Sequence, residues 1–427
     1  MIRLLKNSAL LLLGTALSRG AMFVINVIAA RSLNLEAFGQ YMFIRSSVAV
    51  VDAISTSSMG NVALKQVAYV RSQNDEAGTG KIIRNLLLLN LLITATLAGV
   101  VLSSSDYAAE LLLLQSSDAT RILKIGALLV VISPVASLLQ KILIGLESYY
   151  RPMLAGIAVS TISIPLAYFL TTALGLSGIL LAICAYFALD GLAKIVIVVA
   201  EQRARRAVVP TYDSPVRNGI QMGQVAAIAA SAFGTAFIFW FLRVHTIRSE
   251  VGFRSVAAFD AAYQIFSVIM IVTGAMTSVT LQLMASNTGG VSTNQRNVFL
   301  MTLCMNVVTA ISMAIVFSAL SKPLMALFGE AYVPFHSVIY VLSFVAVLAT
   351  LASFLEKVLI AASDGQFLML CTITAAASAL IYLLAQDGSG AVLSLGHSYV
   401  AFYAGYTIVA ALRITRSPRY KWMALTR

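Results

Sequence analysis

The residues of this sequence that could do chemistry are charged side chains within long apolar runs. Arg19 lies near the middle of the run from Ser8 to Ala30, which contains no acidic residue. A cation at the centre of a membrane helix costs roughly 2.5 to 3.5 kcal/mol, so its retention there favours a binding role. Helical spacing places Thr15, Met22 and Asn26 on the face of Arg19, which predicts a mostly polar face toward a cavity.

A second run, Phe38 to Gly60, repeats this design with Arg45 and Asp52 on one helical face. The two are two turns apart, roughly 10 Å, which is too far for a direct ion pair. Two interpretations stay open for Arg19 and Arg45: they bind an anion, or they pair with Asp52 or Asp190 and hold helices together. Asp190 itself lies four residues before Lys194, so those two can neutralise each other, and a structural pair is the leading interpretation.

Acidic residues within the runs are candidates for ion coupling. Asp260 stands on an otherwise neutral polar stripe, where a carboxylate could bind a proton or Na⁺, and Asp52 is the second candidate. Asp260 could instead pair with Arg243 or Arg254. No catalytic constellation is evident, and the three histidines lack metal-ligand spacing, so no catalytic residue, metal or other cofactor is expected.

The elements that carry these residues are predicted transmembrane helices. Hydrophobic residues make up 59% of the 427 residues, charged residues make up 11%, and the mean hydropathy is +0.90. Apolar runs of roughly 20 residues, each long enough to cross a bilayer, recur throughout. The predicted spans are Ser8–Ala30, Phe38–Gly60, Ile82–Ser103, Ile122–Ile144, Leu154–Leu174, Gly178–Ala200, Asn218–Leu242, Val256–Met284, Val298–Leu320, Val338–Ala362, Phe367–Ala385 and Ala391–Leu412. We therefore expect an all-α integral membrane protein with about 12 transmembrane helices.

The net charge of +12 is interpreted as a topology signal and not as a sign of nucleic-acid binding. If the spans alternate, most cations fall on one side, which predicts that both termini are cytoplasmic and that the first helix is not a cleaved signal. Arg243, Arg248 and Arg254 disagree, because they fall in a predicted outer loop. The basic stretch 201–217 predicts a cytoplasmic linker between six-helix bundles at 1–200 and 218–413, followed by a basic tail at 414–427.

Three local motifs carry a resemblance to a known family. Ala29–Tyr41 (AARSLNLEAFGQY) resembles the pattern R-x-L-G-P-E-x-Y-G-x-Y, with Asn34 in place of the usual glycine. Lys322–Tyr332 (KPLMALFGEAY) and Phe259–Tyr263 (FDAAY) resemble stretches after the ninth helix and at the start of the eighth. The sequence resembles, from end to end, the polysaccharide-transporter branch of the multidrug/oligosaccharidyl-lipid/polysaccharide (MOP) exporter superfamily, the Wzx-type O-antigen and capsule flippases.

This resemblance implies two six-helix bundles that form a V around a central cavity opening alternately to each side of a bacterial inner membrane. It also implies a polyprenyl-diphosphate-linked oligosaccharide as substrate, with a polysaccharide polymerase and a chain-length regulator as possible partners. Arg19 and Arg45 match the cationic cavities of such flippases, and Asn26, Gln221 and Gln224 could hydrogen-bond the sugar. Moving two negative charges outward across 100 mV would release roughly 4.6 kcal/mol, so export could proceed without ATP.

Other functions stay open at this point. A cation-coupled drug antiporter of the same superfamily would need acids and aromatic side chains in its cavity, and Arg19 and Arg45 argue against it. A membrane polysaccharide polymerase or acyltransferase would need a large outer loop or a catalytic cluster, and neither is evident. A non-transporting scaffold would have no reason to bury Arg19.

Overall fold

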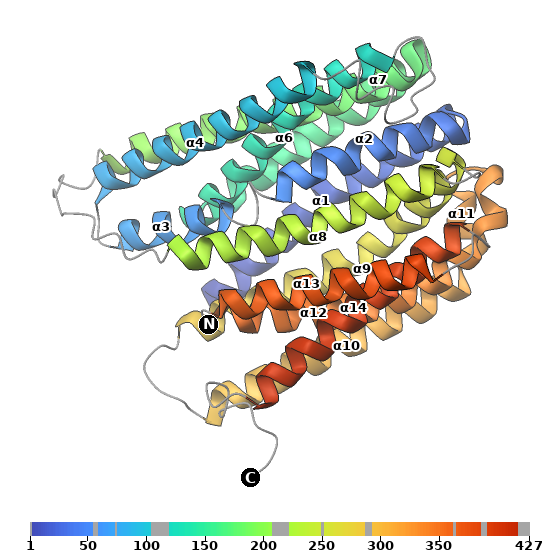
Figure 1. Ribbon diagram of the computed structural model, residues 1–427. Helices are drawn as coiled ribbons and strands as arrows, with labels where there is room; N and C mark the ends of the chain where they lie inside the picture. Colours follow the sequence, from blue (N-terminus) through green and yellow to red (C-terminus); the bar gives the residue numbers. More distant parts are fainter. Residues whose placement is uncertain are drawn as a thin grey trace. The chain divides into compact units, whose positions relative to one another are not determined.

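The computed structural model shows a chain of α-helices (Figure 1). It describes residues 2–53, 59–72, 75–103, 119–206, 222–248, 252–286, 293–361, 364–385 and 391–416. Within these ranges there is no β-strand, and each of the twelve predicted spans overlaps a helix. The predicted all-α membrane fold is therefore confirmed.

The helices have the following bounds. They are α1 (Ile2–Ser32), α2 (Leu35–Ala53), α3 (Gly60–Ser72), α4 (Glu76–Ser103), α6 (Ala119–Gly145), α7 (Tyr150–Arg206), α8 (Met222–Arg248), α9 (Gly252–Ser286), α10 (Thr293–Ala319), α11 (Ser321–Ala326), η2 (Glu330–Phe335), α12 (Ser337–Ala361), α13 (Gly365–Leu384) and α14 (Ala391–Arg416). The sequence did not predict the short helices α3, α11 and η2. Helix α3 buries Ala63 and Val67 in an apolar cluster with Leu139 and Ile142 of α6.

Helix α7 is two antiparallel segments joined at Gly175, where φ is 58° and ψ is −130°. A straight helix of 57 residues would be about 85 Å long, far more than the roughly 30 Å of hydrocarbon in a bilayer. Glycine adopts the positive φ without steric cost. Arg151 Nη1 lies 3.1 Å from Glu201 Oε1, so the first and last turns of α7 lie side by side. The segments match the predicted spans Leu154–Leu174 and Gly178–Ala200.

The chain divides into two compact units, Met1–Ala236 and Phe237–Arg427. In the first unit, α6 packs against α4 and α7, and α7 packs against α1. In the second unit, α12 packs against α9, α10 and α14, and α13 packs against α14. The boundary between the units falls within α8, whereas the sequence predicts a linker at 201–217. Residues 207–221 lie outside the described ranges, so the predicted linker and the bundle limits stay predictions.

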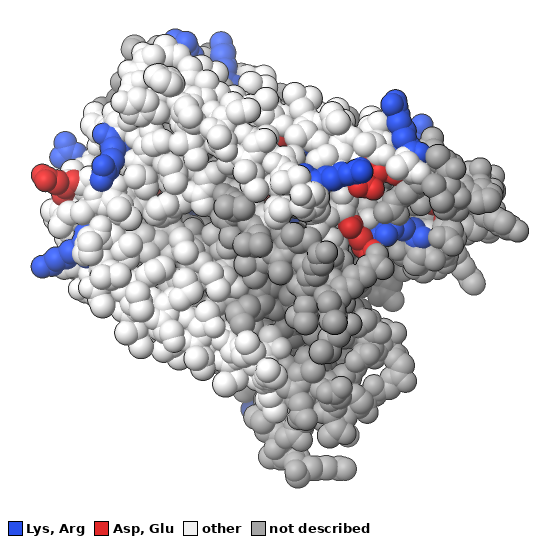
Figure 2. Space-filling view, turned by 180° about the vertical axis from the view of Figure 1, so that it is seen from behind, with Lys and Arg blue, Asp and Glu red and all other residues white. Residues whose placement is uncertain are grey.

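The surface of the helices fits a bilayer. Eight described helices are long and apolar enough to cross a membrane, and α7 with its two segments counts once among them. Leu92, Phe169 and Val196 are 66 to 67% exposed, which suits contact with lipid tails. The face shown in Figure 2 carries few charged side chains among the described residues. The chain is therefore a multi-pass membrane protein.

Candidate functional site

The first candidate group joins α1 to α2 through Arg45. Its Nη1 donates to Asn26 Oδ1 at 2.6 Å and to the Tyr41 hydroxyl at 3.4 Å. The Tyr41 hydroxyl donates to the same Asn26 oxygen at 2.7 Å, and both neutral residues are fully buried. The Arg45 guanidinium also lies 5.9 Å from the centre of the Tyr41 ring. The structure therefore brings together Asn26 and Arg45, two of the predicted substrate-binding residues.

One edge of the Arg45 guanidinium is open. Both of its hydrogen bonds start from Nη1, and within the described ranges Nε and Nη2 donate to no acceptor. Arg45 also forms no ion pair with any acidic side chain that the structure describes. The Nε and Nη2 edge is the fork that binds two oxygens of a phosphate or carboxylate in parallel. Arg45 is therefore a half-buried cation that is oriented by neutral partners and can accept an anion.

Arg19 lies on α1 and is exposed. The residue before it, Ser18, forms a 2.7 Å hydrogen bond with the hydroxyl of Tyr186 on the second segment of α7. Asn26, which holds Arg45, follows Arg19 by seven residues, or roughly 10 Å along the helix. Both predicted head-group cations thus belong to the first unit and are placed by the same helix.

Asp52, a predicted ion-coupling residue, lies on α2 against α6. Ser133 Oγ donates to Asp52 Oδ2 at 2.6 Å. The other carboxylate oxygen, Oδ1, is buried and has no hydrogen-bond partner among the described residues. A buried oxygen of this kind is costly to leave unpaired, so it can take a proton or contact a small cation.

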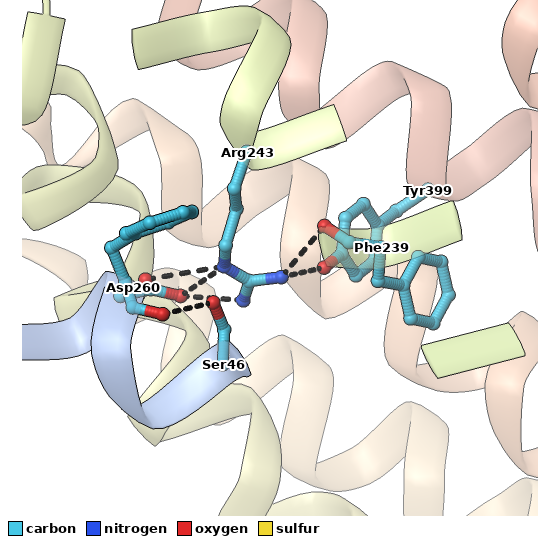
Figure 3. A network of polar contacts seen from close by, with 6 residues as sticks. Ser46, Phe239, Arg243, Asp260 and Tyr399 are labelled. Carbon is cyan, nitrogen blue, oxygen red and sulfur yellow. Dashed lines mark hydrogen bonds and ion pairs between the residues drawn. The ribbon is translucent and has the colours of Figure 1, made fainter. Parts of the chain in front are cut away.

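Asp260, the other predicted ion-coupling residue, is bound to Arg243. Arg243 Nη2 lies 2.6 Å from Asp260 Oδ1, and Arg243 Nε lies 3.2 Å and 3.3 Å from the two carboxylate oxygens (Figure 3). The two side chains are only 7% and 4% exposed. Of the two interpretations of Asp260, the structure shows pairing with Arg243. This does not by itself test a coupling role.

The predicted loop position of Arg243 is wrong. The predicted seventh span ends at Leu242 and places Arg243 in an outer loop, but Arg243 lies within α8. Its charge is neutralised by Asp260, and its Nη1 donates to the Phe239 carbonyl at 3.1 Å and to the Tyr399 hydroxyl at 2.6 Å. The aromatic rings of α9 and α14 around it, Phe259, Tyr263 and Tyr399, have centres 5.5 to 5.9 Å from its Cζ.

Arg243 therefore differs from Arg45 in what its fork binds. The fork of Arg243 is occupied by a carboxylate, while the fork of Arg45 is open in the described part of the chain. Sequence reasoning missed Tyr399, which is 156 residues from Arg243. The only available signal was a tyrosine within an apolar span, since a buried hydroxyl there needs a partner.

Gln221 lies outside the described residues, and Gln224 belongs to α8. Among the residues described, no group of three His, Cys, Asp or Glu side chains could hold a metal ion.

Comparisons with known proteins agree with this architecture. The sequence model of a family described as "Polysaccharide biosynthesis protein" matches residues 4–288. A comparison with curated protein sequences finds no match. Among solved structures, an outward-facing multidrug resistance MATE family transporter of the MOP superfamily has a TM-score of 0.72 at 15% identity, covering 96% of this chain and 93% of that one. An inward-facing transporter of the same description has a TM-score of 0.71 at 14% identity, with the same coverage.

A third solved structure is a MOP superfamily transporter from Pyrococcus furiosus Vc1, described as having a binding pocket of reverse polarity. It has a TM-score of 0.69 at 16% identity and covers 98% of this chain and 94% of that one. Identities this low show the fold, while the sequence model covers more than half of the chain. The chain therefore belongs to the polysaccharide biosynthesis protein family, and it has the fold of the MOP superfamily transporters.

Proposed function

We propose that this protein is a membrane transporter, a flippase for polyprenyl-diphosphate-linked oligosaccharide repeat units. It moves them from the cytoplasmic to the outer leaflet of a bacterial inner membrane for O-antigen, capsule or exopolysaccharide synthesis. The observation that carries the proposal is the open fork of Arg45, because a diphosphate offers the paired oxygens that this fork binds. A drug that carries positive charge would instead be repelled there.

In this mechanism Arg45 binds the diphosphate and Arg19 is the second contact. Asn26 orients Arg45 through its side-chain oxygen, while Gln221 and Gln224 hydrogen-bond the sugar. The lipid tail stays in the bilayer as the units open alternately to the two sides. With both termini in the cytoplasm, outward transfer of two negative charges releases roughly 4.6 kcal/mol at 100 mV.

A cation-coupled drug antiporter is the second candidate. The observation that favours it is Asp52, whose buried Oδ1 has no hydrogen-bond partner among the described residues and could hold a cation. In the flippase the same carboxylate would bind the coupling ion, a role also proposed for Asp260. The two candidates therefore differ in their substrate and not in their use of Asp52.

Export in a flippase-deficient host tests the proposal. Arg45→Ala should reduce polysaccharide export at least tenfold at normal protein abundance, since a hydrogen bond to a charged group contributes about 1.5 to 3 kcal/mol. Arg45→Lys should keep part of the export, because lysine retains the charge and loses the fork. Arg71→Gln is the matched control, because Arg71 pairs with the exposed Glu147 and not with Arg45 or Asn26, and this variant should export normally.

Two results would contradict the flippase. One is normal export by both Arg45→Ala and Arg19→Ala. The other is binding of cationic drugs, but not of a polyprenyl diphosphate, by the purified protein, which would support the antiporter.

A further inference from the structure

The second segment of α7 carries a buried ion pair that the proposed mechanism does not use. Lys194 Nζ donates to Asp190 Oδ2 at 2.5 Å, and the two side chains are 10% and 11% exposed. This is the pairing that the four-residue spacing predicted. The spacing alone favoured a structural role for the pair, and the surroundings of the pair in the structure bear on its function.

The position of this pair indicates that it contributes little to holding the helices together. Both residues belong to α7, so their contact does not join two helices, whereas Arg243 and Asp260 join α8 to α9. An ion pair within one helix contributes little to stability, and removing two charges from water is costly. Charged side chains retained at such a cost inside a membrane are functional candidates by default.

Lys194 also has unused hydrogen-bonding capacity. An ammonium group has three N–H donors, and within the described ranges Asp190 Oδ2 is its one acceptor. A phosphate group carries several acceptor oxygens and could satisfy the other donors. Asp190 then serves as the counter-ion while no substrate is bound.

The pair lies on the face of α7 that meets α1. Tyr186, Asp190 and Lys194 follow one another at four-residue intervals, and all three are buried. Tyr186 binds Ser18, the neighbour of Arg19. The opposite face of this segment is apolar and exposed, with Leu192, Ile195, Val196 and Val199 between 40% and 67% exposed. The charged face is thus the one turned away from lipid.

We propose that Lys194 is a third head-group-binding cation, paired with Asp190 in the substrate-free state. The inference rests on the proposed flippase function. Lys194 lies roughly 12 Å beyond Tyr186 toward the end of α7, which is the cytoplasmic end in the predicted topology. Asn26, with Arg45, lies roughly 12 Å from Ser18 toward the other end of α1. Lys194, Arg19 and Arg45 therefore follow one another along the first unit, and a diphosphate would meet Lys194 first on its way outward.

Binding of geranylgeranyl diphosphate to the purified full-length protein in nanodiscs tests this inference. The double variant Lys194→Met with Asp190→Leu removes both charges and keeps the volume, so it should fold and should bind the probe at least tenfold more weakly. Asp190→Asn should bind the probe at least threefold more tightly, because it removes the competing anion. A merely structural pair would give neither shift. Arg71→Gln should bind within twofold of the parent.

The outcomes separate the two proposals. If the parent protein does not bind the probe, the flippase function itself fails. If the parent binds, Arg45→Ala weakens binding, and both Asp190→Asn and the neutral double variant bind like the parent, the role of Lys194 alone is wrong. If the first neutral pair does not accumulate, Lys194→Gln with Asp190→Asn replaces it, and loss of both neutral pairs from the membrane would show that the charges are structural.

Discussion

Replacing Asp260 with asparagine should strongly destabilise the second unit. The change keeps the size of the side chain but leaves the Arg243 guanidinium buried, at 7% exposure, without its anion. Removing one partner of a buried ion pair costs about 3 to 5 kcal/mol, because the remaining charge is uncompensated. The hydrogen bonds from Arg243 to Tyr399 and to the Phe239 carbonyl remain, so we expect the lower half of that range.

The neutral double variant Arg243→Met with Asp260→Leu should behave differently. It removes both charges and fills the space with apolar atoms, so its free energy of unfolding should lie within about 1 kcal/mol of the parent or above it. The difference between Asp260→Asn and this double variant, about 3 kcal/mol, measures the cost of an unpaired buried arginine.

Trp240 provides the assay, because it lies on α8 one turn before Arg243. The sequence contains two tryptophans, so a Trp422→Phe background leaves Trp240 as the only one. Its fluorescence during denaturant unfolding in mixed micelles gives the free energy of unfolding for each variant. Glu356→Gln is the matched control. Glu356 and Lys357 pair with side chains 36% and 31% exposed, so water can solvate the charge that remains, and the change should alter stability by less than about 1 kcal/mol.

Two observations would refute this reasoning. One is that Asp260→Asn lowers the free energy of unfolding by no more than Glu356→Gln does, which would mean that Arg243 contacts another anion or water. The other is a double variant that costs as much as the two single changes added together, which would mean that Arg243 and Asp260 do not stabilise each other.

Two further predictions concern the first unit. Glu147 has a positive φ of 53° and pairs with Arg71 at 2.9 Å, so Glu147→Gly should be about 1 kcal/mol more stable than Glu147→Ala: both lose the pair, and only glycine relieves the backbone strain. Thermal unfolding of the two purified variants measures this, and equal stabilities would contradict it. Asp52→Asn should weaken the dependence of transport on a proton or Na⁺ gradient in vesicles, because it removes the charge beside Ser133. Unchanged gradient dependence at normal abundance would assign Asp52 to structure.

Hydropathy was sufficient to predict the long apolar helices but not all of their ends. The twelve apolar runs each overlap a helix, because the bilayer requires about 20 apolar residues per crossing. Arg243 lies one residue beyond the predicted end of the seventh span, yet it is a buried residue of α8. The short helix α3 was missed because it packs Ala63 and Val67 against α6, which requires knowing a tertiary neighbour.

The candidate site was predictable in its residues and not in its contacts. A lone arginine within an apolar run is visible in the sequence, and so is the spacing of Asp190 and Lys194. The sequence could not show that Arg45 would bind Asn26 on the preceding helix while Arg243 would bind Asp260 and Tyr399. These pairings depend on which helix faces meet, and they decide which arginine has an open fork.

The turn at Gly175 has a consequence for the orientation of everything that follows it in the chain. Because both segments of α7 are apolar and nearly continuous, the single residue with φ of 58° decides whether this stretch crosses the bilayer twice or once. A β-branched residue at this position would disfavour the turn. With one crossing instead of two, every later helix would be inverted. The basic C-terminal tail, which is predicted to be cytoplasmic, would then have to lie outside, against the charge bias that retains lysine and arginine in the cytoplasm. Gly175 thus decides whether the chain crosses the membrane an even or an odd number of times.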